Sequence, residues 1–300
     1  MTDIVAAIDL GTNTARLLIA HQKPYRQILL TRSITRLGGG FTRERGLSEE
    51  AQQRSLSALG QFAAEISRHG ASRVRAVATS AVRDARNGDS FCRRVQAETG
   101  IRLEVIDGTE EAMLTLRGVA SILDQKGGDL AVFDVGGGST EYTLAADLQP
   151  LFSRSLPIGV VRLTEGKVGV AEMEDKVRRE LEIFQGELEQ EGLGRRFSQA
   201  TLIGTAGTAT TLAAIQIGME SYDYRRVNNH TMPLSEVQRI FELLAPLTPK
   251  QRLEVPGLEP GREDLIIAGT LVVLLTMRVF GFQRFKVSDS GLLEGLILGV

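Results

Sequence analysis

The stretch AIDLGTNTARLLIA, residues 7–20, contains two apolar runs on either side of a turn with glycine at position 11. Short apolar runs bounded by turn residues are typical of buried strands, so strands are expected at residues 4–10 and 15–20. A third strand at residues 27–35 would complete a meander. The chain is therefore expected to open on neighbouring strands joined by a glycine-containing turn.

The same pattern returns 125 residues later in VFDVGGGSTEY, residues 132–142. Asp9 aligns with Asp134 and Gly11 with Gly136, and hydroxyl residues follow each turn. An internal repeat of this size predicts two like domains. The best linker is QKGG at positions 125–128, which places the domains at residues 1–124 and 125–300.

The remaining segments alternate between predicted helices and strands, which indicates an α/β protein. One apolar run, at residues 265–277, is shorter than the ~18 residues needed to cross a bilayer and predicts a buried helix. The single cysteine, Cys92, excludes an internal disulfide and fits a reducing cytosol. Residues 1–100 have a net charge of +6 in a chain of net charge −2, which suits an anionic ligand. No basic run is interleaved with aromatics, so neither nucleic acid nor membrane is an expected partner.

Each copy of the repeat combines an aspartate at the end of a strand with a glycine turn. Glycines expose backbone N–H groups that can surround a phosphate, and the preceding Asp9 or Asp134 can hold a divalent cation. Magnesium suits this arrangement, because it binds through one or two carboxylates together with water and substrate phosphate. A plain β-hairpin is the alternative for one such turn, but two matched copies favour phosphate binding.

Three further segments have candidate functional residues. Gly204, Thr205 and Gly207 form a turn that opens a helix and could bind an anion, or they could simply connect a strand to a helix. Glu110 and Glu111 begin another helix, where they could stabilise its dipole, or one of them could deprotonate a water molecule.

Arg83 and Arg86 are spaced to share one helical face, as a clamp for phosphate oxygens or as surface charge. The sequence contains no nucleophile elbow, no Cys–His pairing and no Walker A motif. Water is therefore the expected nucleophile.

Eight segments occur in an order typical of one family: AIDLGTNTARLLIA, RLGGGF, ATSAVRDARN, GTEEA, VFDVGGGSTEY, IGTAGTATTLAA, PGREDLIIAG and VSDSGLLEG. From residue 4 onward the chain resembles the exopolyphosphatase and guanosine pentaphosphate phosphatase family of the actin-like, sugar-kinase and chaperone ATPase superfamily. The resemblance implies an α/β fold with two ribonuclease-H-like domains flanking a cleft. It also implies an enzyme of the short two-domain type, which is expected to favour short or medium polyphosphate, and the single cysteine favours a cytoplasmic location.

The resemblance also implies roles for particular residues. Glu111 would be the catalytic base, and Asp134 and Glu141, from the family pattern D-x-GGGS-x-E, would complete the catalytic set. Mg²⁺, or Mn²⁺ in its place, would be bound by Asp9, Asp134 and Glu141. Arg262 and Asp264 would support the cleft. The expected phosphate-binding residues are Gly11, Thr12, Asn13, Arg83, Gly136, Gly137, Gly138 and Ser139, with Gly204, Thr205 and Gly207 added from their position at a helix start.

Two positions depart from the family pattern. Asp107 stands where the family commonly has serine, and Leu293 stands where it commonly has arginine. The missing arginine puts in doubt any family contact made at that position. Neither departure affects the carboxylates expected to bind metal or to act as the base.

The sequence therefore predicts an exopolyphosphatase that hydrolyses the terminal phosphoanhydride of inorganic polyphosphate with a water activated by glutamate. A guanosine pentaphosphate 5′-phosphohydrolase is the alternative enzyme. A kinase is disfavoured, because a water-activating acid has no role in it. A sensor that binds guanosine tetraphosphate without turnover is the alternative from another class. The oligomeric state stays open, with a homodimer among the states considered.

Overall fold

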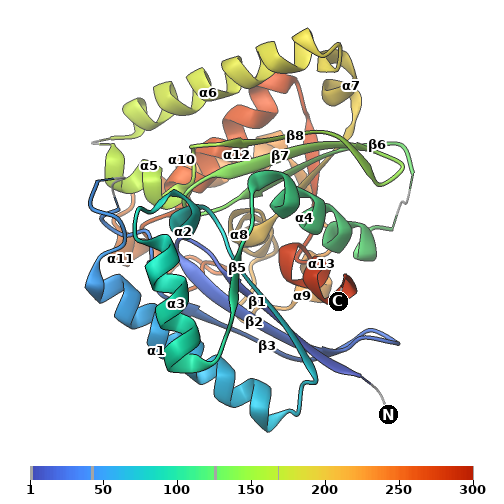
Figure 1. Ribbon diagram of the computed structural model, residues 1–300. Coiled ribbons are helices and arrows are strands. Elements are labelled where there is room, and N and C mark those ends of the chain that lie inside the picture. The colour runs from blue at the N-terminus through green and yellow to red at the C-terminus, as the bar shows by residue number, and fades with distance from the viewer. Residues whose placement is uncertain (1–2, 42–43, 125–126, 168, 300) are drawn as a thin grey trace. The chain divides into compact units, whose positions relative to one another are not determined.

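The computed structural model describes residues 3–41, 44–124, 127–167 and 169–299. It forms two compact units, each built on one sheet (Figure 1). Unit 1 comprises Met1–Gly118 and Gly291–Val300, and unit 2 comprises Val119–Ser290.

Unit 1 contains a five-stranded sheet in the order β3-β2-β1-β4-β5. The first three strands form the predicted antiparallel meander, and β4 and β5 then add in parallel. This order, a meander followed by parallel strands, is ribonuclease-H-like. The strands are β1 (Ile4–Leu10), β2 (Thr14–His21), β3 (Arg26–Ile34), β4 (Arg73–Ala78) and β5 (Leu103–Val105).

Helices cover both faces of this sheet because β1 is apolar on both sides. Ile8 belongs to a cluster with Leu59 of α1 and Phe91 of α3, whereas Ala7 belongs to a cluster with Leu114 of α4 and Leu296 of α13. The helices of unit 1 are α1 (Glu49–Arg68), α2 (Ser80–Asp84), α3 (Gly88–Thr99), α4 (Gly108–Ile122) and α13 (Leu292–Leu298).

The chain crosses between the units twice, which corrects the single boundary expected at residues 124 and 125. Residues 119–124 group with unit 2, and the last ten residues return to unit 1. They return because α13 packs buried leucines on Val5, Ala7 and Leu18 of the first sheet. A contact this remote along the chain leaves no local signal in the sequence.

Unit 2 repeats the same topology. Its sheet has the order β10-β11-β9-β6-β7-β8, so β8-β7-β6-β9-β11 corresponds to β3-β2-β1-β4-β5. β10 adds antiparallel to β11 as an extra edge strand. The strands are β6 (Asp129–Val135), β7 (Thr140–Ala146), β8 (Gln149–Leu156), β9 (Thr201–Thr205), β10 (Thr231–Pro233) and β11 (Arg284–Val287).

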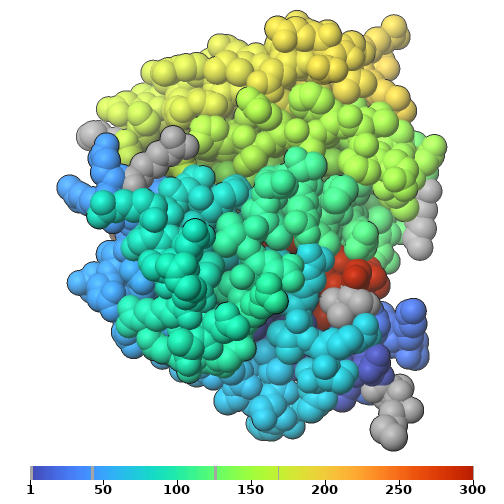
Figure 2. Space-filling view, in the orientation of Figure 1, coloured from blue at the N-terminus to red at the C-terminus, as the bar shows by residue number. Residues whose placement is uncertain are grey.

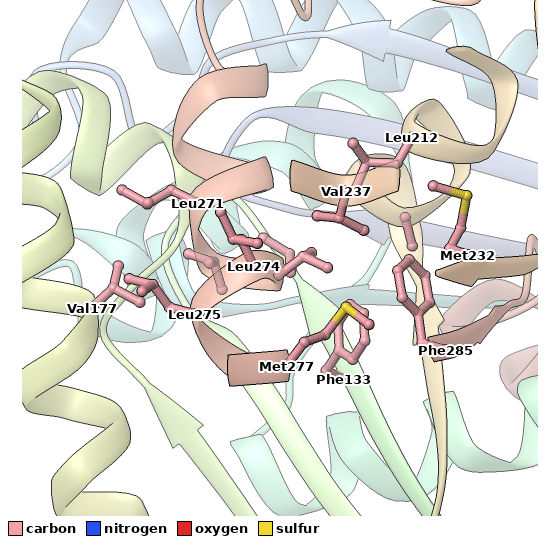
Figure 3. Close-up of a cluster of buried hydrophobic side chains, with 14 of the residues drawn as sticks. Phe133, Val177, Leu212, Met232, Val237, Leu271, Leu274, Leu275, Met277 and Phe285 are labelled. Carbon is pink, nitrogen blue, oxygen red and sulfur yellow. The ribbon is translucent and has the colours of Figure 1, made fainter. Parts of the chain in front are cut away.

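The core of unit 2 is built around α12 (Ile266–Phe280), which is the apolar run predicted to be a buried helix. Figure 3 shows its Leu274 and Met277 among side chains from the sheet, including Phe133 and Phe285. In the part of the chain that the structure describes, no helix is both long and apolar enough to span a bilayer.

The acidic helix α6 (Val170–Gln190) buries Met173, Val177, Leu181 and Phe184 at helical spacing. Its opposite side is uncovered in the space-filling view, as expected for a solvated face (Figure 2). The other helices of unit 2 are α5 (Val160–Gly166), α7 (Gly194–Gln199), α8 (Ala206–Ile217), α9 (Tyr224–Val227), α10 (Leu234–Leu244) and α11 (Pro249–Arg252).

Candidate active site

The two glycine turns are closed by the same hydrogen bond. The Gly11 N–H donates to the Thr14 carbonyl at 3.1 Å, and the Gly136 N–H donates to the Ser139 carbonyl at 3.0 Å. These two donors therefore hold the turns together and are not available to bind a phosphate, which corrects the expectation for Gly11 and Gly136.

In unit 1 the carbonyls at the tip of the turn are fastened to the segment after β3. Thr12 O accepts from the Gly38 N–H at 2.8 Å, and Asn13 O accepts from the Thr35 N–H at 3.0 Å. The Thr12 hydroxyl also lies 2.9 Å from that of Ser80, at the start of α2. Because C=O and N–H point in opposite directions across a trans peptide, the Asn13 N–H is directed away from these contacts.

The turn of unit 2 is fastened in a similar way to the first turn of α5. Gly136 O accepts from the Val160 N–H and Gly137 O from the Val161 N–H, both at 2.9 Å. The N–H groups of Gly137 and Gly138 consequently point the other way. No hydrogen bond with another described residue engages these two donors, so both are available to an anion.

A close backbone approach also explains Gly159, which precedes α5. A Cβ at this position would lie 2.3 Å from the Gly138 carbonyl carbon. Only glycine lets the turn pack this closely, and the turn is thereby held in one conformation.

The residue opposite each strand-end aspartate differs between the repeats. Asp9 pairs in register with Arg16, whose guanidinium binds Oδ2 at 2.6 and 3.0 Å. Asp134 pairs with Glu141, so two carboxylates occupy adjacent positions on one face of the second sheet. Two adjacent carboxylates repel each other when both are ionised, and a cation bound between them relieves that repulsion. In unit 1, by contrast, Arg16 already neutralises Asp9, so a metal site that includes Asp9 stays a prediction.

Two serines orient Glu141. Its Oε1 accepts from the Ser139 hydroxyl at 2.6 Å and from the Ser155 hydroxyl, on β8, at 2.7 Å. Within the described ranges no group of three or more His, Cys, Asp or Glu is arranged to hold a metal. Asp134 and Glu141 fit a magnesium ion that completes its shell with water and phosphate oxygens.

The expected base and the expected phosphate-binding arginine contact each other in unit 1. Arg83 Nη1 lies 3.2 Å from Glu111 Oε2 and also donates to the Ile106 carbonyl at 2.9 Å. The Glu111 side chain is only 12% exposed. The ion pair thus holds a largely buried carboxylate in one orientation at the first turn of α4.

Glu110 has a different environment, although it precedes Glu111 directly. Its carboxylate binds Arg75 at 2.6 Å and is 40% exposed. Its backbone N–H donates to Asp107 Oδ1 at 2.8 Å, so Asp107 caps the start of α4. Serine and aspartate are both good caps, which explains why aspartate can replace the serine common in the family.

We expect Asp107→Ala to lower the free energy of unfolding by about 1 kcal/mol, because the cap of α4 is lost. Asp107→Ser should keep most of that stability. Urea unfolding of the three proteins measures the difference. An equal loss for alanine and serine would show that the cap is not what stabilises the helix.

The predicted helical clamp of Arg83 and Arg86 is not formed. α2 ends at Asp84 and Ala85 is extended, so the two arginines do not share a helical face. The preceding strand and following loop leave α2 only five residues long. Of the two arginines, Arg83 is the one that contacts Glu111 in the described structure.

The third glycine segment, at residues 204–207, is closely packed against neighbouring side chains of unit 2. A Cβ on Gly204 would lie 2.4 Å from Phe133 Cζ, and one on Gly207 would lie 1.8 Å from Arg262 Nη1. The Thr205 hydroxyl is buried and donates to the Ser290 carbonyl at 3.1 Å. Glycine at 204 is therefore required by the packing of unit 2, whereas a Cβ at 207 would displace the end of the Arg262 side chain. Phosphate binding at this segment stays a prediction.

The remaining expected positions lie in separate places. Arg262 makes an ion pair with Glu259 at 3.4 Å in unit 2, and Asp264 follows two residues later, just before α12. Leu293, which stands where arginine is common, is 1% exposed in the cluster beneath the first sheet. An apolar side chain suits this interior position.

Two residues in contact with the candidate carboxylates were not predicted, Arg16 beside Asp9 and Ser155 beside Glu141. Arg16 is the repeat counterpart of Glu141, both seven residues after the strand-end aspartate, so a longer alignment of the two copies would have found it. Ser155 had no such signal, because β8 was not predicted from its mixed polar and apolar residues.

The described structure is thus a pair of ribonuclease-H-like units, each with a glycine turn after a strand-end aspartate. A model of the Ppx/GppA phosphatase family matches residues 18–300, and the chain belongs to this family.

Among curated proteins, Exopolyphosphatase 2 of Mycobacterium tuberculosis is 35% identical over 99% of this chain and 98% of its own length. The bifunctional 3-dehydroquinate synthase/phosphatase of Fusobacterium nucleatum is 34% identical over 98% of this chain, which spans only 46% of that protein. The Ppx/GppA enzyme of Aquifex aeolicus has a TM-score of 0.80 and 32% identity, covering 99% of both chains. An exopolyphosphatase from Cytophaga hutchinsonii has a TM-score of 0.89 and 27% identity, again covering 99% of both.

Proposed function

We propose that this protein is an exopolyphosphatase that releases the terminal phosphate of inorganic polyphosphate by hydrolysis. The observation that carries the proposal is the Asp134–Glu141 pair beside a turn whose Gly137 and Gly138 N–H groups are available to an anion. Relatives named exopolyphosphatases, matched over nearly their whole length, support the same activity.

Each residue would contribute a defined step. Glu111 accepts a proton from the attacking water, while Arg83, held by the Ile106 carbonyl, keeps that carboxylate oriented and presents positive charge to phosphate oxygens. The Gly137 and Gly138 N–H groups donate to the phosphate oxygens. Magnesium bound by Asp134 and Glu141, oriented by Ser139 and Ser155, would neutralise the charge of the phosphate oxygens.

A substrate panel tests the proposal. Phosphate release would be measured with polyphosphate of several lengths, guanosine pentaphosphate and ATP, each with Mg²⁺, with Mn²⁺ and with excess chelator. We expect polyphosphate to give the highest kcat/KM and chelator to abolish release. Preference for guanosine pentaphosphate would support the alternative enzyme, and no release from any substrate would support a non-hydrolytic sensor.

The location of the protein is part of the proposal. Cys92, its single cysteine, is half-buried and unpaired, and burial raises the pKa of its thiol. A chain without disulfides suits a reducing compartment, which favours the cytoplasm.

A further inference from the structure

The segment VSDSGLLEG, residues 287–295, is unexplained by the chemistry above. Its glycines at 291, just before α13, and 295, within α13, lie close to the backbone of α4. A Cβ on Gly295 would lie 1.9 Å from the Leu114 carbonyl oxygen, and one on Gly118 would lie 1.9 Å from the Gly291 carbonyl oxygen. The two helices, which lie side by side in Figure 1, therefore touch through their main chains at two points.

The other side of α13 is fixed to the sheet of unit 1. Leu292, Leu293, Leu296 and Ile297 are all nearly fully buried in the cluster that contains the side chains of β1 and β2. The Ile297 carbonyl also accepts a hydrogen bond from Gln22 at 3.0 Å. Because α13 is packed tightly against the sheet, it cannot move further toward the sheet to make room for α4. The contact between the two helices therefore sets how closely α4 approaches α13.

The position of α4 in turn sets the position of Glu111. Glu111 lies three residues before Leu114 in α4, and the Leu114 carbonyl faces Gly295. Its carboxylate meets Arg83 of α2, which also donates to the Ile106 carbonyl, and the Ile106 N–H is bonded to the Ala78 carbonyl of β4 at 3.1 Å. Since Arg83 belongs to α2 and Ile106 is bonded to the first sheet, a shift of α4 changes the distance between Glu111 and the Arg83 guanidinium.

We propose that Gly295 and Gly118 are positioning residues. They let α4 pack close to α13, and they thereby place the Glu111 carboxylate at the distance from Arg83 and the attacking water that hydrolysis requires. The inference rests on the proposed role of Glu111 as the base. A methyl group at position 295 needs roughly 1 Å more room, and a misplacement of about 1 Å can cost about 10²-fold in rate.

The test compares Gly295→Ala and Glu111→Gln, singly and together, by steady-state hydrolysis of polyphosphate. We expect Gly295→Ala to lower kcat by about 10²-fold, with KM changed less than about twofold. In the Glu111→Gln background the same substitution should cost almost nothing more, because its effect passes through the missing base.

Gly299→Ala is the matched control at the end of the same helix. Its Cβ would lie 2.3 Å from Arg117 Nη1, the far end of a flexible side chain that can move aside. Its activity should stay at the wild-type level. A loss as large as that of Gly295→Ala would overturn the proposal, because any added methyl on α13 would then suffice.

Different results would contradict the positioning role of Gly295 and the role of Glu111 as the base. If Gly295→Ala costs the same factor with and without Glu111, its role is only structural, and the positioning proposal is overturned while the base assignment stands. If Glu111→Gln keeps full activity, the base assignment fails and positioning fails with it. Should Gly295→Ala not fold, Leu296→Val loosens the same cluster without a clash. Its smaller loss must also vanish in the Glu111→Gln background, and persistence there would overturn the proposal.

Discussion

Glu111→Gln is expected to lower kcat by about 10²–10⁴-fold, the usual contribution of a positioned general base. Glutamine keeps the size of the side chain and can still accept a hydrogen bond from Arg83, but it cannot take a proton from water. KM should change little, because the backbone donors and Arg83, which we propose to bind phosphate, remain. Steady-state phosphate release from polyphosphate, at saturating and limiting substrate, separates the two parameters.

Glu110→Gln provides the internal control for this experiment. The Glu110 side chain points toward Arg75 and solvent, and the Glu111 side chain toward Arg83. Loss of an exposed ion pair has a small effect, so kcat should stay within about twofold of wild type. Equal losses for both substitutions would mean that the two acids only stabilise the start of α4.

Asp134→Asn is expected to reduce activity by about a hundredfold or more at moderate Mg²⁺, since bound metal contributes several kcal/mol of charge stabilisation. Asparagine keeps the shape but removes one of the two adjacent carboxylate charges on β6 and β7. More Mg²⁺ should be needed for half-maximal activity. A magnesium titration of phosphate release measures this shift directly.

Ser155→Ala serves as the comparison for the metal assignment. It removes one of the two hydroxyl donors to Glu141 and leaves both carboxylates in place. Loss of such an orienting contact costs roughly 10–100-fold in metal affinity, so its titration should lie between wild type and Asp134→Asn. Full activity of the wild-type protein in excess chelator would refute the metal site altogether.

Much of the fold could be predicted because it depends on local patterns. The strand at Ile4–Leu10 was expected at the residues where it occurs, and the apolar run at residues 265–277 forms most of the buried helix α12. Apolar runs, turn glycines and caps act within a few residues, so they are visible in the sequence. β8 has no such clear alternation, and it was missed.

The candidate site likewise contains motifs that are visible in the sequence and contacts that only the structure shows. The sequence by itself determined the two glycine turns, their strand-end aspartates and the acidic pair at the start of α4, because these are short motifs with local geometry. Only the tertiary structure decided that Arg16 neutralises Asp9, that Arg83 binds Glu111 and that Gly295 lies against α4. Ion pairs and main-chain contacts join residues that are distant in the chain or opposite across a sheet. Their energies depend on positions in space, which only the packed fold supplies.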